Sequence, residues 1–151
     1  MGQNSHNYTN ELVVSAKIDT TIQNIHMGRC EIYATATIRN NSADTIRYYH
    51  DICENFFKSD NKEISLDMVP CDTGGSVTEI VLPHQTNTEI VHLHTILSDL
   101  KSKKFRIGFI YFYDIHMCGG PYVNSIMDAL TAKKSEEAIK NPIWSNTLYL
   151  K

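Results

Sequence analysis

Apolar and polar residues alternate along much of the chain. In the clearest run, residues 30–39, every second residue from Cys30 to Ile38 is apolar or small. Residues 12–19 alternate in the same way. Because successive side chains of a strand point to opposite faces of a sheet, a period of two predicts half-buried β-strands.

Further short strands are predicted where β-branched and aromatic residues stand between turn-forming residues. They cover residues 45–49, 55–59, 77–82, 89–95, 105–113 and 143–150. Turns rich in Asn, Asp, Gly and Pro separate them, at residues 39–44, 72–75 and 83–87. About eight strands at such spacings are typical of an antiparallel sandwich.

One segment has a helical period instead. Apolar residues recur there at spacings of three and four, namely Val123, Ile126, Met127 and Leu130. A second short helical turn is expected at residues 135–140, and it must end before Pro142, because the residue before a proline avoids the α region. We therefore expect a helical insertion over about residues 116–142, between the last two strands.

These elements predict an all-β fold, an antiparallel immunoglobulin-like β-sandwich of about seven to nine strands with one inserted α-helix. The length of 151 residues fits one domain. We place that domain at residues 12–151, after a flexible polar lead-in at residues 1–11. The apolar faces of the strands predict a core that contains Val14, Ile32, Ile38, Leu82, Val91, Leu93, Ile107, Phe109 and Trp144.

Composition and charge limit the kinds of partner that the chain is expected to bind. The net charge of −3 gives no electrostatic reason to expect nucleic acid. No apolar run reaches the roughly 18 residues of a membrane span. The first ten residues have no apolar core of a signal peptide, which leaves two readings open. Either Met1 starts a cytoplasmic protein, or the domain is exported and its signal, with a membrane tether upstream, has been removed.

The four cysteines do not form a C-x-x-C pair. Cys30 falls among the inward positions of its strand, so we expect a buried free thiol. Cys53 and Cys71 flank a polar excursion and are the best candidates for a disulfide. Four reduced thiols, with Cys118 included, remain an equal alternative.

Two stretches carry a family likeness. In residues 36–46, Asn40-Asn41-Ser42 stands between two strands, and in residues 80–90 a strand ends at Leu82-Pro83 before a polar turn. This arrangement resembles immunoglobulin-like modules of bacterial envelope and secreted proteins, lipoproteins among them. The resemblance implies an exported binding module whose ligand is a protein, a small molecule or a glycan. Such modules share no common site, so no residue role carries over.

His92 and His94 are the first candidate site. Two residues apart on a strand, they share a face and can chelate zinc or copper. Burying Val91 and Leu93 gains about 1.5–3 kcal/mol each, whereas an unsatisfied buried polar group costs about 1–3 kcal/mol. The histidines should therefore face outward. The sequence identifies no third ligand, so two solvated histidines are the alternative.

The second candidate is the segment around a Gly-Gly pair. A thiol close to a histidine and to a helix start can become nucleophilic, and the glycines let a ligand approach the backbone. We expect these residues to line a groove between the inserted helix and the sheet, where a ligand would bind. They are His116, Cys118, Gly119, Gly120 and Tyr122. The alternative is a packed turn whose helix merely closes one end of the core.

No P-loop, G-x-S-x-G, H-E-x-x-H or dinucleotide motif occurs, so the sequence assigns no catalytic residue and no cofactor. The expected function is a non-catalytic binding or interaction module of an exported or envelope-associated bacterial protein. The alternative is a metal-binding or thiol-dependent enzyme that uses His92 and His94, or His116 and Cys118.

Overall fold

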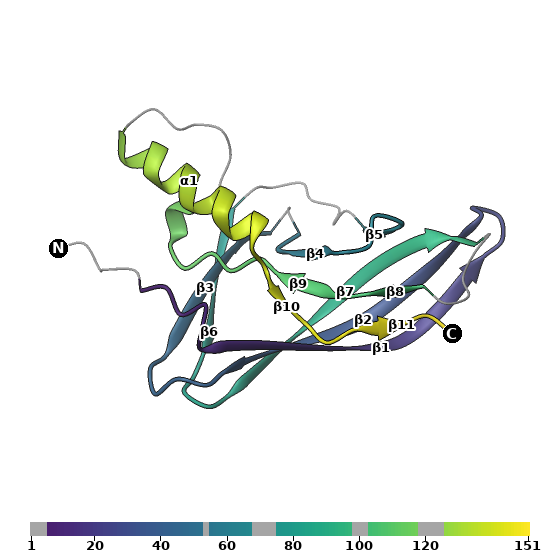
Figure 1. Cartoon of the computed structure of the whole chain (residues 1–151), viewed down its shortest axis with the longest axis horizontal. Helices are drawn as coiled ribbons and strands as arrows, with labels where there is room; N and C mark the ends of the chain where they lie inside the picture. The colour runs from purple at the N-terminus through teal and green to yellow at the C-terminus, as the bar shows by residue number, and fades with distance from the viewer. Residues whose placement is uncertain (1–5, 53–54, 68–74, 98–102, 118–125) are drawn as a thin grey trace.

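The computed structural model describes residues 6–52, 55–67, 75–97, 103–117 and 126–151, with side chains of the last segment from Leu130 onward. Most of these residues lie in antiparallel strands, which confirms the all-β class (Figure 1). The strands are β1 (Leu12–Asn24), β2 (Arg29–Asn40), β3 (Ile46–Asp51), β4 (Phe57–Ser59), β5 (Ile64–Leu66), β6 (Ser76–Val81), β7 (Thr86–Ile96), β8 (Lys104–Phe105), β9 (Ile107–Phe109), β10 (Ile143–Trp144) and β11 (Leu148–Tyr149). The helical elements are the 3-10 turn η2 (Ile115–Met117) and the helix α1 (Ile126–Lys140).

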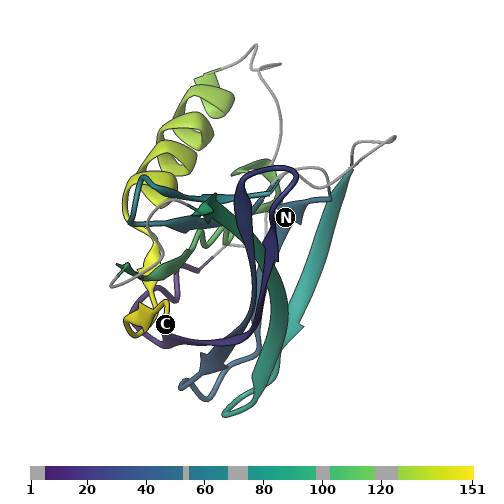
Figure 2. The same cartoon turned by 90° about the vertical axis from the view of Figure 1, so that its right-hand side faces the viewer.

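The longest strands form one sheet in the order β1-β2-β7-β5. Its centre is the β2–β7 pair, which runs in unbroken register from Arg29 opposite Ile96 to Arg39 opposite Thr86. The remaining strands form three small sheets, β10-β9-β4, β11-β8 and β3-β6. Figure 2 shows the C-terminal strands β10 and β11, in yellow, on one side of the long strands. One face of the large sheet is thus covered and the other is open.

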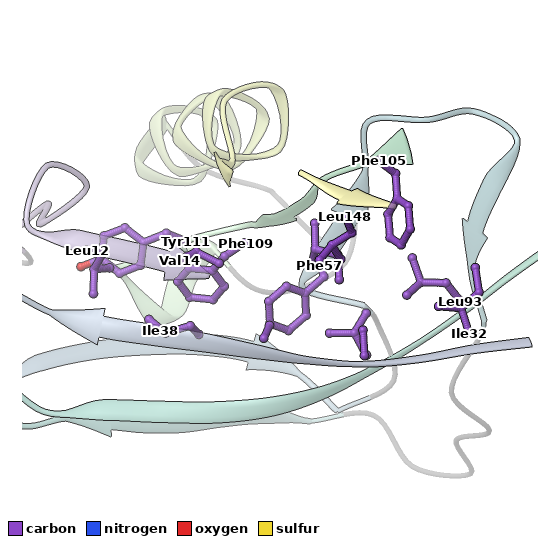
Figure 3. Packing of buried hydrophobic residues seen from close by; sticks show 14 of the residues in the cluster. Leu12, Val14, Ile32, Ile38, Phe57, Leu93, Phe105, Phe109, Tyr111 and Leu148 are labelled. Atoms are coloured by element: carbon purple, nitrogen blue, oxygen red, sulfur yellow. The ribbon is translucent and has the colours of Figure 1, made fainter. Parts of the chain in front are cut away.

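The core lies between the long strands and the short ones (Figure 3). The alternation of β2 buries Ile32 and Ile38 completely, and Phe105 and Phe109 meet them from the other side. Seven of the nine predicted core residues are buried, namely Val14, Ile32, Ile38, Val91, Leu93, Ile107 and Phe109. The sequence pattern therefore identified most of the inward face.

Two predicted core residues are not in the core. Leu82 is 56% exposed, because β6 ends at Val81 and Val81 takes the buried position. Trp144 is only half-buried and lies under the Arg106 guanidinium, 4.9 Å from the ring centroid. A Cβ on Gly108 would come within 2.8 Å of Trp144 Cζ3, so the indole lies directly against this glycine.

The helix differs from its prediction in length and in its packed face. Residues 135–140 belong to the same helix as residues 126–134, and the helix ends at Lys140, just before the expected stop. Leu130 is 57% exposed, so this member of the predicted apolar stripe does not pack. The side chain of Val123 lies outside the described residues, as do those of Ile126 and Met127. The less exposed positions are small or polar, as in Ser135, whose hydroxyl donates to the Met117 carbonyl at 2.8 Å.

Asn40 organises the predicted turn between β2 and β3. The residue is completely buried, and its Nδ2 donates to the carbonyls of Asp44 at 2.7 Å and Val81 at 3.0 Å. Its Oδ1 accepts the backbone N–H of Ser42 at 2.8 Å. One side chain therefore ties the β2–β3 corner to the end of β6.

The start of the described chain contacts this corner. Tyr8 packs against the core, and its hydroxyl donates to Asp44 Oδ2 at 3.0 Å. The Tyr8 carbonyl accepts the N–H groups of Glu11 and Leu12. Residues 6–11 of the predicted flexible lead-in are thus held by specific contacts.

The free thiol of Cys30 is buried, as expected, and burial raises its pKa. Cys53, Cys71 and Cys118 lie outside the described residues, so the disulfide stays a prediction. In the part of the chain that the structure describes, no helix has both the length and the hydropathy needed to cross a membrane.

Candidate functional site

The open face of the large sheet carries both strand histidines. Val91 and Leu93 are buried, so His92 and His94 project from the opposite face of β7, as predicted. The β2–β7 register places Glu31 opposite His94, and Tyr33 opposite His92. The rings of Tyr33 and His92 stack with centroids 4.3 Å apart and planes 9° apart, which fixes the orientation of the imidazole.

Asp67 joins the two histidines. It directly follows the edge strand β5, and its backbone N–H donates to the His92 carbonyl at 3.0 Å. The His94 Nδ1–H group donates to Asp67 Oδ1. The other carboxylate oxygen, Oδ2, lies 3.0 Å from His92 Nε2. A single carboxylate thus contacts both imidazoles, one through each oxygen.

The contact between His92 Nε2 and Asp67 Oδ2 is close but unsatisfied. Both atoms are shielded from water, and neither has a hydrogen-bond partner among the described residues. An unprotonated imidazole nitrogen and a carboxylate oxygen are both acceptors, so at this distance either a proton, as in the Nε2–H tautomer of the neutral imidazole, or a metal ion must lie between them. The geometry therefore favours a proton or a metal ion at this point.

Arg29 is the cation that the cluster already contains. Its Nη2 donates to Glu31 Oε1 at 2.6 Å and lies 3.8 Å from Asp67 Oδ2. The hydrogen bond to Glu31 raises the pKa of the Arg29 guanidinium. Two carboxylates thus share one fixed positive charge, which leaves the group one negative charge in excess when both imidazoles are neutral.

Three of these side chains can hold a metal ion together. One donor atom each from Glu31, Asp67 and His92 lies within 4.8 Å of the other two. Tetrahedral zinc, with bonds of about 2.0–2.2 Å, needs donors roughly 3.4 Å apart, which small side-chain rotations would achieve. His94 is not in this set. The predicted chelating pair is therefore replaced by His92 with two carboxylates, while His94 holds Asp67 in place.

The cluster formed by Arg29, Glu31, Asp67, His92 and His94 is called the outer-face cluster below. The sequence identified the two histidines in it and missed the other three members. Glu31 shares the outward face of the most regular strand, a signal that could have revealed it. Asp67 follows a strand of three residues, which is too short to show a periodic pattern.

A pocket lies beside α1, where the sequence predicted a groove between the inserted helix and the sheet. It has a volume of about 340 Å³ and is lined by Tyr111, Tyr113, Lys134 and Glu137, together with part of the N-terminal segment and the start of β10. Lys134 Nζ lies 5.8 Å from the centroid of the Tyr113 ring. The predicted location is thus concave, and its described lining does not include His116.

Only one of the residues predicted to line that groove, His116, lies among the described residues. His116 is exposed in η2, where its backbone N–H donates to Asp114 Oδ1 at 3.0 Å, and it is not part of the lining. The other four, Cys118, Gly119, Gly120 and Tyr122, lie outside the described residues. Their role stays a prediction.

Comparisons with known proteins identify no relative of this chain. No protein-family model matches the chain, and no match is found among curated proteins or solved structures. The functional argument therefore rests on the side chains themselves, and the outer-face cluster is the described group with the most distinctive chemistry.

Proposed function

We propose that the chain is a non-catalytic binding module and that a divalent transition-metal ion, Zn²⁺ as the type case, is its ligand at the outer-face cluster. The observation that carries the proposal is the 3.0 Å contact between His92 Nε2 and Asp67 Oδ2. Both atoms are shielded from water and lack hydrogen bonds within the described residues. A metal ion between them would take the place of a proton on Nε2 and be coordinated by both atoms.

Glu31 supplies the third ligand. Its carboxylate is already within reach of the other two donors, but its Oε1 is occupied by Arg29. Binding therefore requires the side chain of Arg29, the first residue of β2, to swing away from Glu31. Three protein ligands leave a fourth position for water or for a group of a partner molecule.

Two neighbours support the ligands without binding the ion. Stacking on Tyr33 holds the His92 ring, and the His94 Nδ1–H group holds the Asp67 carboxylate. Such second contacts fix ligand orientation in metal sites and often change affinity 10–100-fold when removed. The cluster is thus arranged as a metal site with its supports.

The geometry of the outer-face cluster favours metal binding over catalysis. The Asp67–His94 pair has the form of two members of a hydrolase triad, and the β5–β7 register sets Ser65 opposite His94. However, no hydrogen bond between Ser65 and His94 is found among the described residues, and Ser65 is exposed. Without a nucleophile bonded to the imidazole, the triad logic is incomplete.

The order of strands supports the finer fold proposal, an immunoglobulin-like sandwich. Immunoglobulin domains place four strands in one sheet, in the order first-second-fifth-fourth, against a sheet formed by the others. Here β1-β2-β7-β5 faces β10-β9-β4, and β7 pairs with β2 in the way that the fifth strand of such domains pairs with the second. An exported, envelope-associated location is proposed on the turn resemblance alone.

The metal proposal is tested with untagged protein and zinc chloride in isothermal titration calorimetry. We expect one Zn²⁺ per chain, and at least tenfold weaker binding in His92→Ala and in Glu31→Gln. His116→Ala is the matched control, since His116 is a histidine outside the cluster and belongs to the rival site. Absence of stoichiometric binding by the wild type, or an equal loss in His116→Ala, would overturn the proposal.

A further inference from the structure

The free edge of the large sheet borders a groove. β1 is the edge strand opposite β5, and the groove lies between β1 and the C-terminal strand β11. Its volume is about 490 Å³, and its walls are residues 16–21 of β1 and residues 147–151. Two strand edges, rather than two layers of side chains, therefore face each other across this space.

Asn146 imitates an added strand at one end of the groove. Its Oδ1 accepts the Ala16 N–H at 2.9 Å, and its Nδ2 donates to the Ala16 carbonyl at 3.1 Å. These are the two hydrogen bonds that a neighbouring antiparallel strand would make with Ala16. The edge of β1 is thus capable of pairing on this side, and a side chain satisfies it at one residue only.

Beyond Ala16 the main chain of this edge has no hydrogen-bond partner within the described part of the chain. The main-chain groups of a strand point alternately to its two sides, so Ile18 follows Ala16 in pointing toward the groove. The register of β1 against β2 shifts between Ile18 and Thr20, and after this bulge the alternation directs Thr21 and Gln23 outward. No hydrogen bond to the main chain on this side of residues 18–23 occurs among the described residues.

The sequence protects only part of this edge: Lys17, Asp19 and the bulge after Ile18 lie in its first half, whereas its last residues have no such protection. Native edge strands are usually blocked by charged residues, proline or short length. β1 is 13 residues long, and its last five residues, 20–24, contain no charge and no proline. Three of them are β-branched, which favours an extended conformation. The composition therefore suits a strand that accepts a partner.

We propose that this groove binds an extended peptide segment of a partner polypeptide, which adds to the edge of β1 as a further strand. The peptide's inward side chains would meet Ile18, Leu148 and Leu150, which are half-buried or buried at the groove. Its outward side chains would meet Lys17 and Lys151, which are exposed on the rim. The preferred segment therefore alternates apolar and acidic residues.

The chemical groups that line the groove favour a peptide as its ligand. Unpaired N–H and C=O groups spaced along a strand are matched by another polypeptide backbone, which supplies affinity, while side-chain contacts at every second residue supply selectivity. A second copy of the chain, joined edge to edge through β1, is the competing outcome. The site lies on the sheet edge opposite Asp67, so it does not depend on the metal proposal.

The test uses fluorescent seven-residue peptides in fluorescence anisotropy, in buffer with EDTA so that metal binding plays no part. We expect a peptide of alternating Val and Glu to bind. We expect at least tenfold weaker binding when Glu is replaced by Lys, or when alternate peptide nitrogens are methylated, since methylation removes the strand hydrogen bonds.

The protein-side test removes one outward N–H group. Thr21→Pro lacks this donor, and proline is tolerated where the N–H of an edge strand faces away from its neighbour. Thr21→Val is the matched control, which changes the side chain and keeps the N–H. We expect Thr21→Pro to weaken binding at least tenfold and Thr21→Val to leave it unchanged.

Hydrogen exchange of the wild type supplies a readout that does not depend on how the variant folds. The bound peptide should slow exchange of the Thr21 and Gln23 amides. The proposal is overturned if no peptide binds, if N-methylated and unmodified peptides bind equally, or if sedimentation shows that β1 is covered by a second copy instead.

Discussion

Arg29→Met is the most informative substitution in the outer-face cluster. It distinguishes an arginine that competes with the metal ion for the carboxylates from one that helps to position them. In the free protein the Arg29 guanidinium occupies Glu31 and stands near Asp67. If these carboxylates bind Zn²⁺, the arginine competes with the ion, and its removal should tighten binding. If the arginine instead organises the carboxylates for another purpose, its removal should leave zinc affinity unchanged or weaker.

The size of the effect follows from the hydrogen bond that the ion must displace. A charge-assisted bond contributes about 1.5–3 kcal/mol, and partial exposure of both side chains lowers this toward the surface range of about 0–1 kcal/mol. Because the surface range applies here, we expect zinc binding to tighten by up to about fivefold. Methionine keeps the length and the apolar stem of the arginine, so the packing changes little.

The assay is zinc titration of wild type, Arg29→Met and Arg39→Met, combined with thermal unfolding. Arg39 is an exposed arginine of the same strand, whose Nε bonds to Asn41 Oδ1 at 2.9 Å outside the cluster. Without zinc, Arg29→Met should melt below wild type, since two carboxylates lose their counter-charge. Zinc should raise its melting temperature more than that of wild type. Equal or weaker zinc binding in Arg29→Met than in Arg39→Met would refute the reasoning.

Two further predictions concern stability. Gly108→Ala should lower the free energy of unfolding by about 1–3 kcal/mol in urea denaturation, as overpacking does, because its Cβ would come within 2.8 Å of Trp144 Cζ3 and 2.9 Å of Pro142; a loss below about half a kcal/mol would show that the indole moves freely aside. Desolvation raises the pKa of Asp60, but the hydrogen bonds and charge of Arg106 outweigh it and hold the pKa below its usual value. The stabilisation that Asp60 gives should therefore be complete above the unfolded value of about 3.9 and disappear as the pH falls through the lower, folded value. Asp60→Asn should be less stable than wild type at pH 7, and the difference should shrink below about pH 4; a difference that is constant with pH would contradict the assignment.

The long strands were predictable because the polarity of each residue indicates whether its side chain lies on the buried or the exposed face of the sheet. Residues 30–39 alternate without exception, and the structure extends that strand by only one residue at each end, to Arg29–Asn40. The outward direction of His92 followed from the same local argument, since burial of Val91 and Leu93 outweighs burial of imidazoles. Where a strand is long and one face is covered, local pattern and final structure agree.

The short strands near the C-terminus were predicted less well, because tertiary contacts end them. Residues 143–150 were expected as one strand, but β10 stops at Trp144. The hydroxyl of Ser145 accepts the N–H of Ile107 at 3.0 Å, in the place where a strand would offer a carbonyl. A side chain that takes over a main-chain hydrogen bond leaves no trace in the hydrophobic pattern.

The candidate site shows the same division. His92, His94 and Glu31 lie on strands whose faces the sequence reveals, but their proximity depends on the register of β2 against β7. Asp67 depends on β5, a strand that the pattern did not predict at all. Sequence reasoning thus found the imidazoles of the site and could not find the carboxylate that joins them.

Because Asp67 follows β5, a metal ion bound at the outer-face cluster would also stabilise this edge of the sheet. β5 is an edge strand of three residues, and its pairing with β7 covers only Ile64 to Leu66. An ion held by Glu31, Asp67 and His92 would link the end of β5 to both β2 and β7, and so fasten the weaker edge of the sheet. The opposite edge, β1, is long and has open main-chain groups beyond Ala16. The two proposals, metal binding at one edge and strand addition at the other, therefore concern separate parts of one sheet, and a variant that abolishes either kind of binding should leave the other intact.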